Sequence, residues 1–240
     1  LVKPIVKLTY LIVPGEDKKA DNMHLEFIGE NSVFSTTAAL PNIIGETTRM
    51  ADIAIANLSK GIDTLFTKDQ KAIEEIYETE KSVNYLNEQI TNYLVKANQL
   101  SLPVEDRKLL GGLFHVVNDI ERIGDHAVNL AEAAKRNLVD NLTISGEAQE
   151  ELKDLFNNVI TLVDRSIHAF NKHEISDEEA RELSELEEHI DDVADECQDA
   201  HIFRLNRKEC NTESGMLYMN TITDFERVGD HAINIAFLTK

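Results

Sequence analysis

The chain has 240 residues, of which 42% are hydrophobic, and its formal net charge at pH 7 is −20. This charge argues against nucleic acid as a partner and against docking on anionic lipid through a basic patch. It favours metal cations or a basic protein surface instead. Only 10 Gly and 4 Pro interrupt the chain, and its richness in Ala, Leu and Glu is typical of an all-helical protein.

Residues 1–39 have poor helical periodicity and are predicted to be a linker. They open with the apolar stretch LVKPIVKLTYLIV, which is too short to span a membrane. Because the chain begins with Leu rather than Met, we expect it to be a fragment that follows something hydrophobic in a longer protein. Its two cysteines, Cys197 and Cys210, make no disulfide framework, and Cys197 is expected to be a buried thiol near the apolar stripe of its helix.

From about Pro41 onward, apolar residues recur with the 3.6-residue period of amphipathic helices. Turn and cap signals, such as SLPVED and NLTISGE, divide this region into segments. The six predicted helices cover 41–66, 68–98, 103–137, 147–172, 177–206 and 211–239. The predicted fold is therefore all-α, with two tandem three-helix bundles in residues 40–140 and 141–240.

One phrase occurs twice in the chain. Residues 119–131 read DIERIGDHAVNLA and residues 224–236 read DFERVGDHAINIA, with nine of thirteen positions identical and the other four apolar in both. The two copies are 105 residues apart, which predicts a tandem duplication of a unit of that length. Each copy has a mid-helix glycine, Gly124 or Gly229, and we expect each to let a neighbouring helix approach closely.

The duplicated phrase places like charges on one helix face. Glu121 and Asp125 are four residues apart, as are Glu226 and Asp230, so each pair would repel unless something positive lies between them. The apolar residues of the same helices gather on the opposite side, which is the predicted core. Two copies of this unfavourable spacing indicate a bound cation.

The second and fifth predicted helices offer further ligands. ETEKSVNYLNE aligns with ELEEHIDDVAD, so the second copy has a carboxylate where the first has an amide. Oxygen ligands of this kind suit Mg, Ca, Mn or Fe. The predicted metal ligands are Glu80, Asn84, Glu121 and Asp125 in the first half and Glu187, Asp191, Glu226 and Asp230 in the second. The second site is expected to bind more strongly because Asp191 replaces Asn84.

Other functional interpretations of the sequence remain open. His126 and His231 directly follow the phrase's second Asp, and each is a candidate metal ligand, a hydrogen-bond donor to the carboxylates, or a plain surface residue. No Gly-rich phosphate loop and no nucleophile motif is present, which predicts that the chain is not an enzyme. A carboxylate-bridged metalloenzyme is kept as an alternative.

The two phrases resemble the signature of PhoU proteins, which regulate phosphate uptake, and the resemblance covers residues 40–240. It implies two three-helix bundles whose E-x-x-x-D motifs bind clusters of iron or other metals, with Zn, Mn, Mg or Ca as alternatives to iron. The implied ligands are Glu121, Asp125, Glu187, Asp191, Glu226 and Asp230. The sequence departs from the family pattern at Asn84, where Asp is expected.

The segment before the first bundle resembles the linker of sodium-dependent phosphate cotransporter proteins. This implies a metal-binding regulatory domain on the cytoplasmic face of the cell membrane, with the membrane transporter region of the same chain as its partner. Phosphate held through bound metal is a further candidate partner, and a homo-oligomer is left open. The alternative is a free-standing PhoU regulator that bridges a phosphate transporter and a sensor kinase.

Overall fold

The computed structural model describes residues 23–29, 38–172 and 174–238, and it confirms the predicted all-helical fold. Within these ranges there are six helices and no strands, and no helix is long and apolar enough to cross a membrane. Each helix begins and ends within two residues of its predicted bounds. The helices are α2 (Ala39–Thr67), α3 (Gln70–Ala97), α4 (Val104–Val139), α5 (Gly146–Lys172), α6 (Asp177–Asn206) and α7 (Thr212–Phe237).

Side-chain caps explain where several helices begin. The Asp69 carboxylate accepts a hydrogen bond from the backbone N–H of Lys71 at the start of α3. At the start of α6, Ser176 and Glu179 each accept a hydrogen bond from the other's backbone N–H, which forms a capping box. At the start of α7, the Asn211 side-chain oxygen accepts a hydrogen bond from the backbone N–H of Ser214. These caps satisfy backbone donors that have no partner within the helix.

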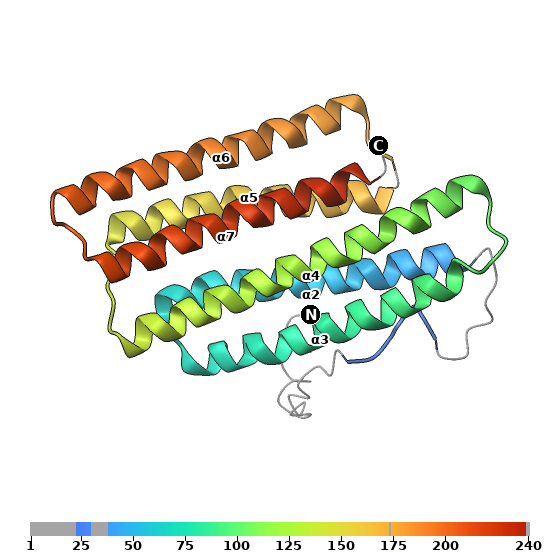
Figure 1. Cartoon of the computed structure of the whole chain (residues 1–240), viewed down its shortest axis with the longest axis horizontal. Helices are drawn as coiled ribbons and strands as arrows, with labels where there is room; N and C mark the ends of the chain where they lie inside the picture. Colours follow the sequence, from blue (N-terminus) through green and yellow to red (C-terminus); the bar gives the residue numbers. More distant parts are fainter. Residues whose placement is uncertain (1–22, 30–37, 173, 239–240) are drawn as a thin grey trace, which may run out of the picture.

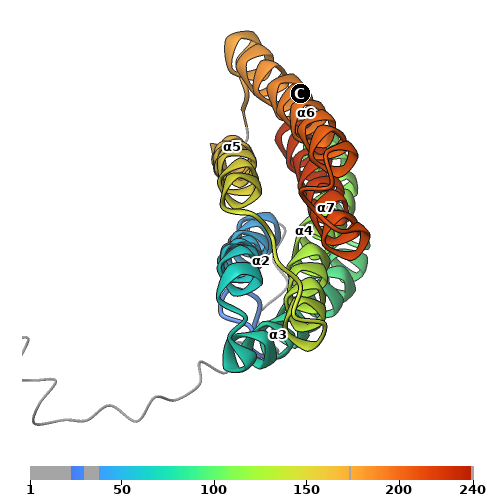
Figure 2. The same ribbon diagram turned by 90° about the vertical axis from the view of Figure 1, so that its left-hand side faces the viewer.

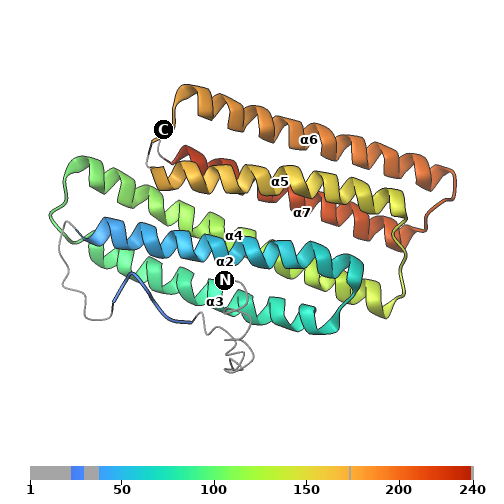
Figure 3. The same cartoon turned by 180° about the vertical axis from the view of Figure 1, so that it is seen from behind.

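The helices pack as two triplets that lie side by side. Helices α2, α3 and α4 contact one another, α7 contacts both α5 and α6, and α5 contacts α6. The triplets meet where α4 packs against α7 and α2 packs against α5, with α3 and α6 at the two outer edges (Figures 1 and 3). Viewed along the helices, α4 and α7 lie next to each other in one layer (Figure 2). They run in opposite directions, as Figure 1 shows.

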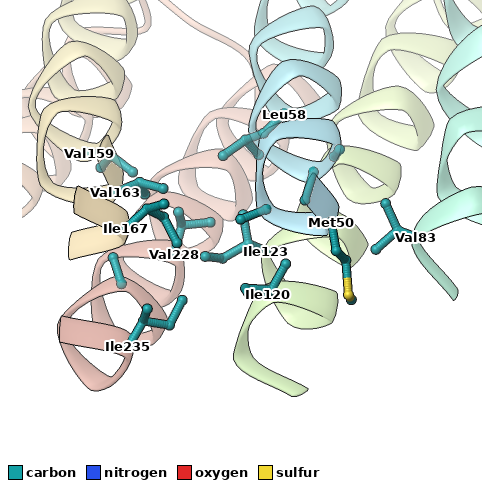
Figure 4. Close-up of a cluster of buried hydrophobic side chains, with 14 of the residues drawn as sticks. Met50, Leu58, Val83, Ile120, Ile123, Val159, Val163, Ile167, Val228 and Ile235 are labelled. Atoms are coloured by element: carbon teal, nitrogen blue, oxygen red, sulfur yellow. The ribbon is translucent and has the colours of Figure 1, made fainter. Parts of the chain in front are cut away.

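The hydrophobic core is continuous across the two triplets. Met50 and Leu58 of α2 and Ile123 of α4 belong to the same buried cluster as Val163 of α5 and Val228 of α7 (Figure 4). Each of these side chains is at most 1% exposed. Because burial of this kind supplies most of the folding free energy, the two halves stabilise each other and their relative arrangement is fixed by packing.

The described part of the predicted linker packs against α2. The buried carboxylate of Glu46 accepts hydrogen bonds from the backbone N–H groups of Glu26, Phe27 and Ile28, at 2.9, 2.8 and 3.3 Å. Arg49 balances its charge at 2.7 Å. The apolar opening of the chain lies outside the described residues.

Candidate metal centres

The first acidic cluster lies between α3 and α4 and is centred on Glu80. This side chain comes from α3, is 7% exposed, and has no hydrogen-bond partner among the described residues for either carboxylate oxygen. Gly124 of α4 makes room for it, because a Cβ atom at position 124 would lie only 2.9 Å from Glu80 Oε2. Burial, together with the charges of Asp125 and Glu121, raises the pKa of Glu80 to about 8. In the metal-free protein this carboxyl is therefore mostly protonated at neutral pH.

Glu121 and Asp125 complete the carboxylates of the first cluster from consecutive turns of α4. Burial and then the charge of Asp125 raise the pKa of Glu121. Arg122 partly compensates the cluster, with its guanidinium nitrogens 3.2 Å from Asp125 and 3.7 Å from Glu121. Asn84 lies one turn beyond Glu80 on α3 and is exposed. The structure thus brings the three predicted carboxylates close together, with Asn84 further along the same helix.

The second acidic cluster lies between α6 and α7. Burial and then the neighbouring carboxylates raise the pKa values of Glu187, Asp191 and Glu226, and Asp230 contributes to each of these shifts. Asp195, one turn beyond Asp191, also acts on Asp191 and Glu226. None of the four predicted ligands makes a hydrogen bond or ion pair with a described residue. The four predicted carboxylates therefore repel one another without a hydrogen-bonded or ion-paired partner in the part of the chain that the structure describes.

The two clusters differ in depth although the phrase is repeated. If a methyl group were added at Gly229, its nearest atoms would be Ile190 Cγ2 at 3.8 Å and Leu162 Cδ2 at 3.9 Å, which is ordinary contact. No described carboxylate lies over this glycine as Glu80 lies over Gly124. The expectation that both glycines permit an unusually close approach is therefore right for Gly124 and wrong for Gly229.

Across the described ranges, no group of three or more His, Cys, Asp or Glu side chains is already arranged to hold a metal ion. Side-chain rotation would be needed to close either cluster around a cation. The buried carboxylate of Glu80, which has no hydrogen-bond partner among the described residues, fits a cation that would supply the missing partner. Metal binding at the eight residues stays a prediction.

The two copies of the phrase contact each other through polar side chains, and the sequence did not predict these contacts. His126 of α4 lies with Nδ1 2.8 Å from Asp224 of α7, and His231 of α7 lies with Nδ1 2.9 Å from Asp119 of α4. Each phrase therefore uses its first Asp to bind the His of the other phrase. The signal was present in the sequence as the same Asp-to-His spacing in both copies, but the pairing depends on the antiparallel contact of α4 with α7.

A further cluster of buried polar side chains, which was also not predicted, lies where α6 ends and α7 begins. Both terminal nitrogens of Arg204 bind the carboxylate of Glu151, at 2.6 and 2.7 Å, and the Tyr218 hydroxyl donates to the same carboxylate. Cys197 is buried beside this group, as its place near the apolar stripe predicted. These contacts join α5, α6 and α7.

The fold and these clusters define a duplicated all-helical protein with one acidic cluster in each helix triplet. The chain belongs to the PhoU family, since the PhoU domain model matches residues 47–134 and again residues 152–239. The two matched ranges coincide with the two helix triplets and confirm the internal repeat.

Curated relatives and solved structures agree with this assignment. The chain is 26% identical over 192 residues to the phosphate-specific transport system accessory protein PhoU homolog 1 of Thermotoga maritima, covering 79% of this chain and 81% of that protein. It is 28% identical over 204 residues to the PhoU homolog of Xylella fastidiosa, covering 82% and 81%. The crystal structure of PhoU from Pseudomonas aeruginosa superposes with a TM-score of 0.77 at 19% identity, covering 85% of this chain and 97% of that chain.

These comparisons correct the functional interpretation of the sequence. The relatives are accessory proteins of phosphate-specific transport systems, matched along about four-fifths of their own length, and they are not sodium/phosphate cotransporters. The expected role as the regulatory domain of such a cotransporter, with a transporter region of the same chain as partner, is therefore wrong. The misleading signal was the segment before α2, none of which the PhoU domain model matches. The relatives are named as accessory proteins of a transport system, which agrees with the prediction from the motifs that the chain is not an enzyme.

Proposed function

We propose that this protein is a free-standing accessory regulator of a phosphate-specific transport system. The observation that supports it is the match of the PhoU domain to both halves of the chain, together with relatives that are accessory proteins of such systems. In this role it acts at the cytoplasmic face of the membrane and bridges a phosphate transporter and a sensor kinase.

Metal binding at the two acidic clusters is the second part of the proposal. Glu80, Asn84, Glu121 and Asp125 hold one metal centre, and Glu187, Asp191, Glu226 and Asp230 hold the other. The support is electrostatic, because burial and mutual repulsion raise the pKa values of Glu80, Glu121, Glu187, Asp191 and Glu226. A cation reverses the effect of that repulsion and links two helices of each triplet.

The chemistry of the ligands suits hard and borderline cations. Carboxylate and amide oxygens favour Mg, Ca, Mn and Fe, and iron is the choice that the family resemblance implies. When bound, such an ion supplies positive charge on a surface that otherwise repels anions. The residues themselves orient the ion and set its affinity, with Glu80 reaching it from the buried side.

Complementation tests the regulatory role. A bacterium that lacks its own PhoU is supplied with this protein, and uptake of radiolabelled phosphate is measured at high and low external phosphate. We expect this protein, or a chimera that carries the transporter-contacting surface of the host's PhoU, to restore the difference in phosphate uptake between high and low external phosphate. Unregulated uptake despite normal amounts of folded protein would contradict the proposal.

Elemental analysis and Mn²⁺ titration test the metal centres. The paired variant Glu121→Gln/Asp125→Asn is compared with Glu132→Gln, which removes an exposed acid from the same helix. We expect the paired variant to lose about half of the bound metal and the control to keep all of it. Equal metal content in both proteins, or none in the wild type under any supplementation, would argue against the centres.

A further inference from the structure

The two reciprocal histidines lie together where the two triplets meet. The rings of His126 and His231 have centroids 6.0 Å apart and line one cleft of about 430 Å³ between α4 and α7. Neither ring belongs to the carboxylate ligand sets of the two acidic clusters. The cleft adjoins the first acidic cluster, since Asp125 also lines it, and it is the place where the histidines of both copies of the phrase converge.

Both imidazoles are held in the same tautomer. A carboxylate can only accept a hydrogen bond, so the Nδ1 atoms that lie 2.8 Å from Asp224 and 2.9 Å from Asp119 must carry the hydrogen. In the neutral ring this leaves the lone pair on Nε2. Metal-binding histidines are oriented by a carboxylate on their other nitrogen in this way. Asn129 fixes Asp224 further by donating to it at 2.8 Å.

The spacing and the charge of the cleft both suit a metal cation. A metal about 2.0–2.1 Å from each Nε2 atom places the two ring centroids about 5–6 Å apart. Three carboxylates, those of Asp119, Asp224 and Asp125, outnumber the two guanidinium groups of Arg122 and Arg227 in and around the cleft. The local charge therefore favours a cation over an anion.

We propose that His126 and His231 form a third metal site, in which two imidazoles contributed by the two repeats bind one nitrogen-preferring divalent cation such as Zn²⁺, Ni²⁺ or Cu²⁺. Imidazole selects these ions, whereas the carboxylate clusters select harder ones. The remaining coordination positions take water. A metal at this point ties α4 directly to α7 and so stabilises the arrangement of the two triplets.

Electron paramagnetic resonance of the full chain with less than one equivalent of Cu²⁺ tests this site. We expect nitrogen splitting from two imidazoles in the wild type and from one in His126→Gln or His231→Gln, with Cu²⁺ affinity at least tenfold weaker in each variant. The matched control is His115→Gln, an exposed histidine on the same helix, which should behave as the wild type does. Splitting from fewer than two imidazoles in the wild type, or unchanged splitting in both variants, would overturn the proposal.

A second variant keeps the test decisive if loss of a ring impairs folding. Asp224→Asn leaves both imidazoles in place and removes only the orienting charge, so Cu²⁺ affinity should fall about tenfold or more while helicity is retained. Unchanged affinity in this variant would count against the proposed tautomer and hence the site. Mn²⁺ binding, measured on the same samples, reports on the acidic clusters separately. If the wild type binds no Mn²⁺, the proposed carboxylate metal centres are contradicted, while the imidazole site is unaffected by that result.

Discussion

Replacing Glu80 by Gln should stabilise the metal-free protein at alkaline pH. The substitution keeps the size and shape of a side chain that is 7% exposed, and it removes a charge that has no partner among the described residues. The pKa of Glu80 is about 8 in the folded protein, whereas its ordinary value is 4.5. In the folded protein Glu80 therefore either stays protonated or ionises without a positively charged partner among the described residues. The wild type therefore loses stability wherever the unfolded chain ionises more readily.

The sign and size of the effect follow from these two pKa values. Below about pH 4 both states are protonated and Glu80 costs nothing, whereas between pH 4.5 and about 8 stability falls as pH rises. The full difference corresponds to at most about 5 kcal/mol, and screening by nearby water reduces it to about 2 kcal/mol. Glu80→Gln should therefore unfold about 4–8 °C higher than the wild type near pH 9, and at nearly the same temperature near pH 4.

Thermal and urea unfolding of chelator-treated protein, followed by circular dichroism across this pH range, would measure the difference. Glu88→Gln, an exposed acid on the same helix, is the matched control and should show no such pH dependence. A second readout is proton release: Mn²⁺ binding at pH 7 should displace most of the proton held by Glu80, and the Gln variant should lose that component. A variant that is less stable than the wild type at both pH extremes would refute the reasoning, since it would mean that the carboxylate has a stabilising partner.

Three further predictions concern the two clusters. Gly229→Ala should raise the free energy of unfolding by about 0.5–1 kcal/mol through helix propensity. Gly124→Ala should raise it less, because Glu80 and Val83 must shift to admit the new methyl group, and urea unfolding of both variants would measure this difference. Glu226→Gln/Asp230→Asn should raise the melting temperature of the metal-free protein, and it should lower the metal content of the protein as purified. A lower melting temperature would mean that these carboxylates have stabilising partners. Phosphate should bind the metal-loaded protein and not the metal-free protein, and equal affinities in calorimetric titrations would remove metal-dependent phosphate sensing.

The fold could be predicted from the sequence because its determinants are local. Helix period, caps such as Ser176 before α6, and a long repeat together indicate six helices in two similar sets. The core face of α4 was also predictable, since Ile120, Ile123 and Ala127 recur at helical spacing and are all buried. Information of this kind lies within one helix and needs no knowledge of its neighbours.

The site was predictable only up to the contacts between helices. The spacing of Glu121 and Asp125 places them on one face, but nothing in it indicates that Glu80 lies buried over Gly124 while Glu187 stays partly exposed. The pairing of His126 with the other repeat likewise follows from the antiparallel packing of α4 on α7. These features depend on how the triplets meet, which the periodicity of either half does not specify.

Duplication of the phrase has produced two clusters that are chemically alike and physically different. The first holds one deeply buried acid, Glu80, whose raised pKa makes protons compete with any cation near neutral pH. The second has no acid buried in this way, since its four carboxylates are partly or fully exposed. The first cluster should therefore gain metal affinity as pH rises through neutrality, and Mn²⁺ titrations across that pH range would measure the change.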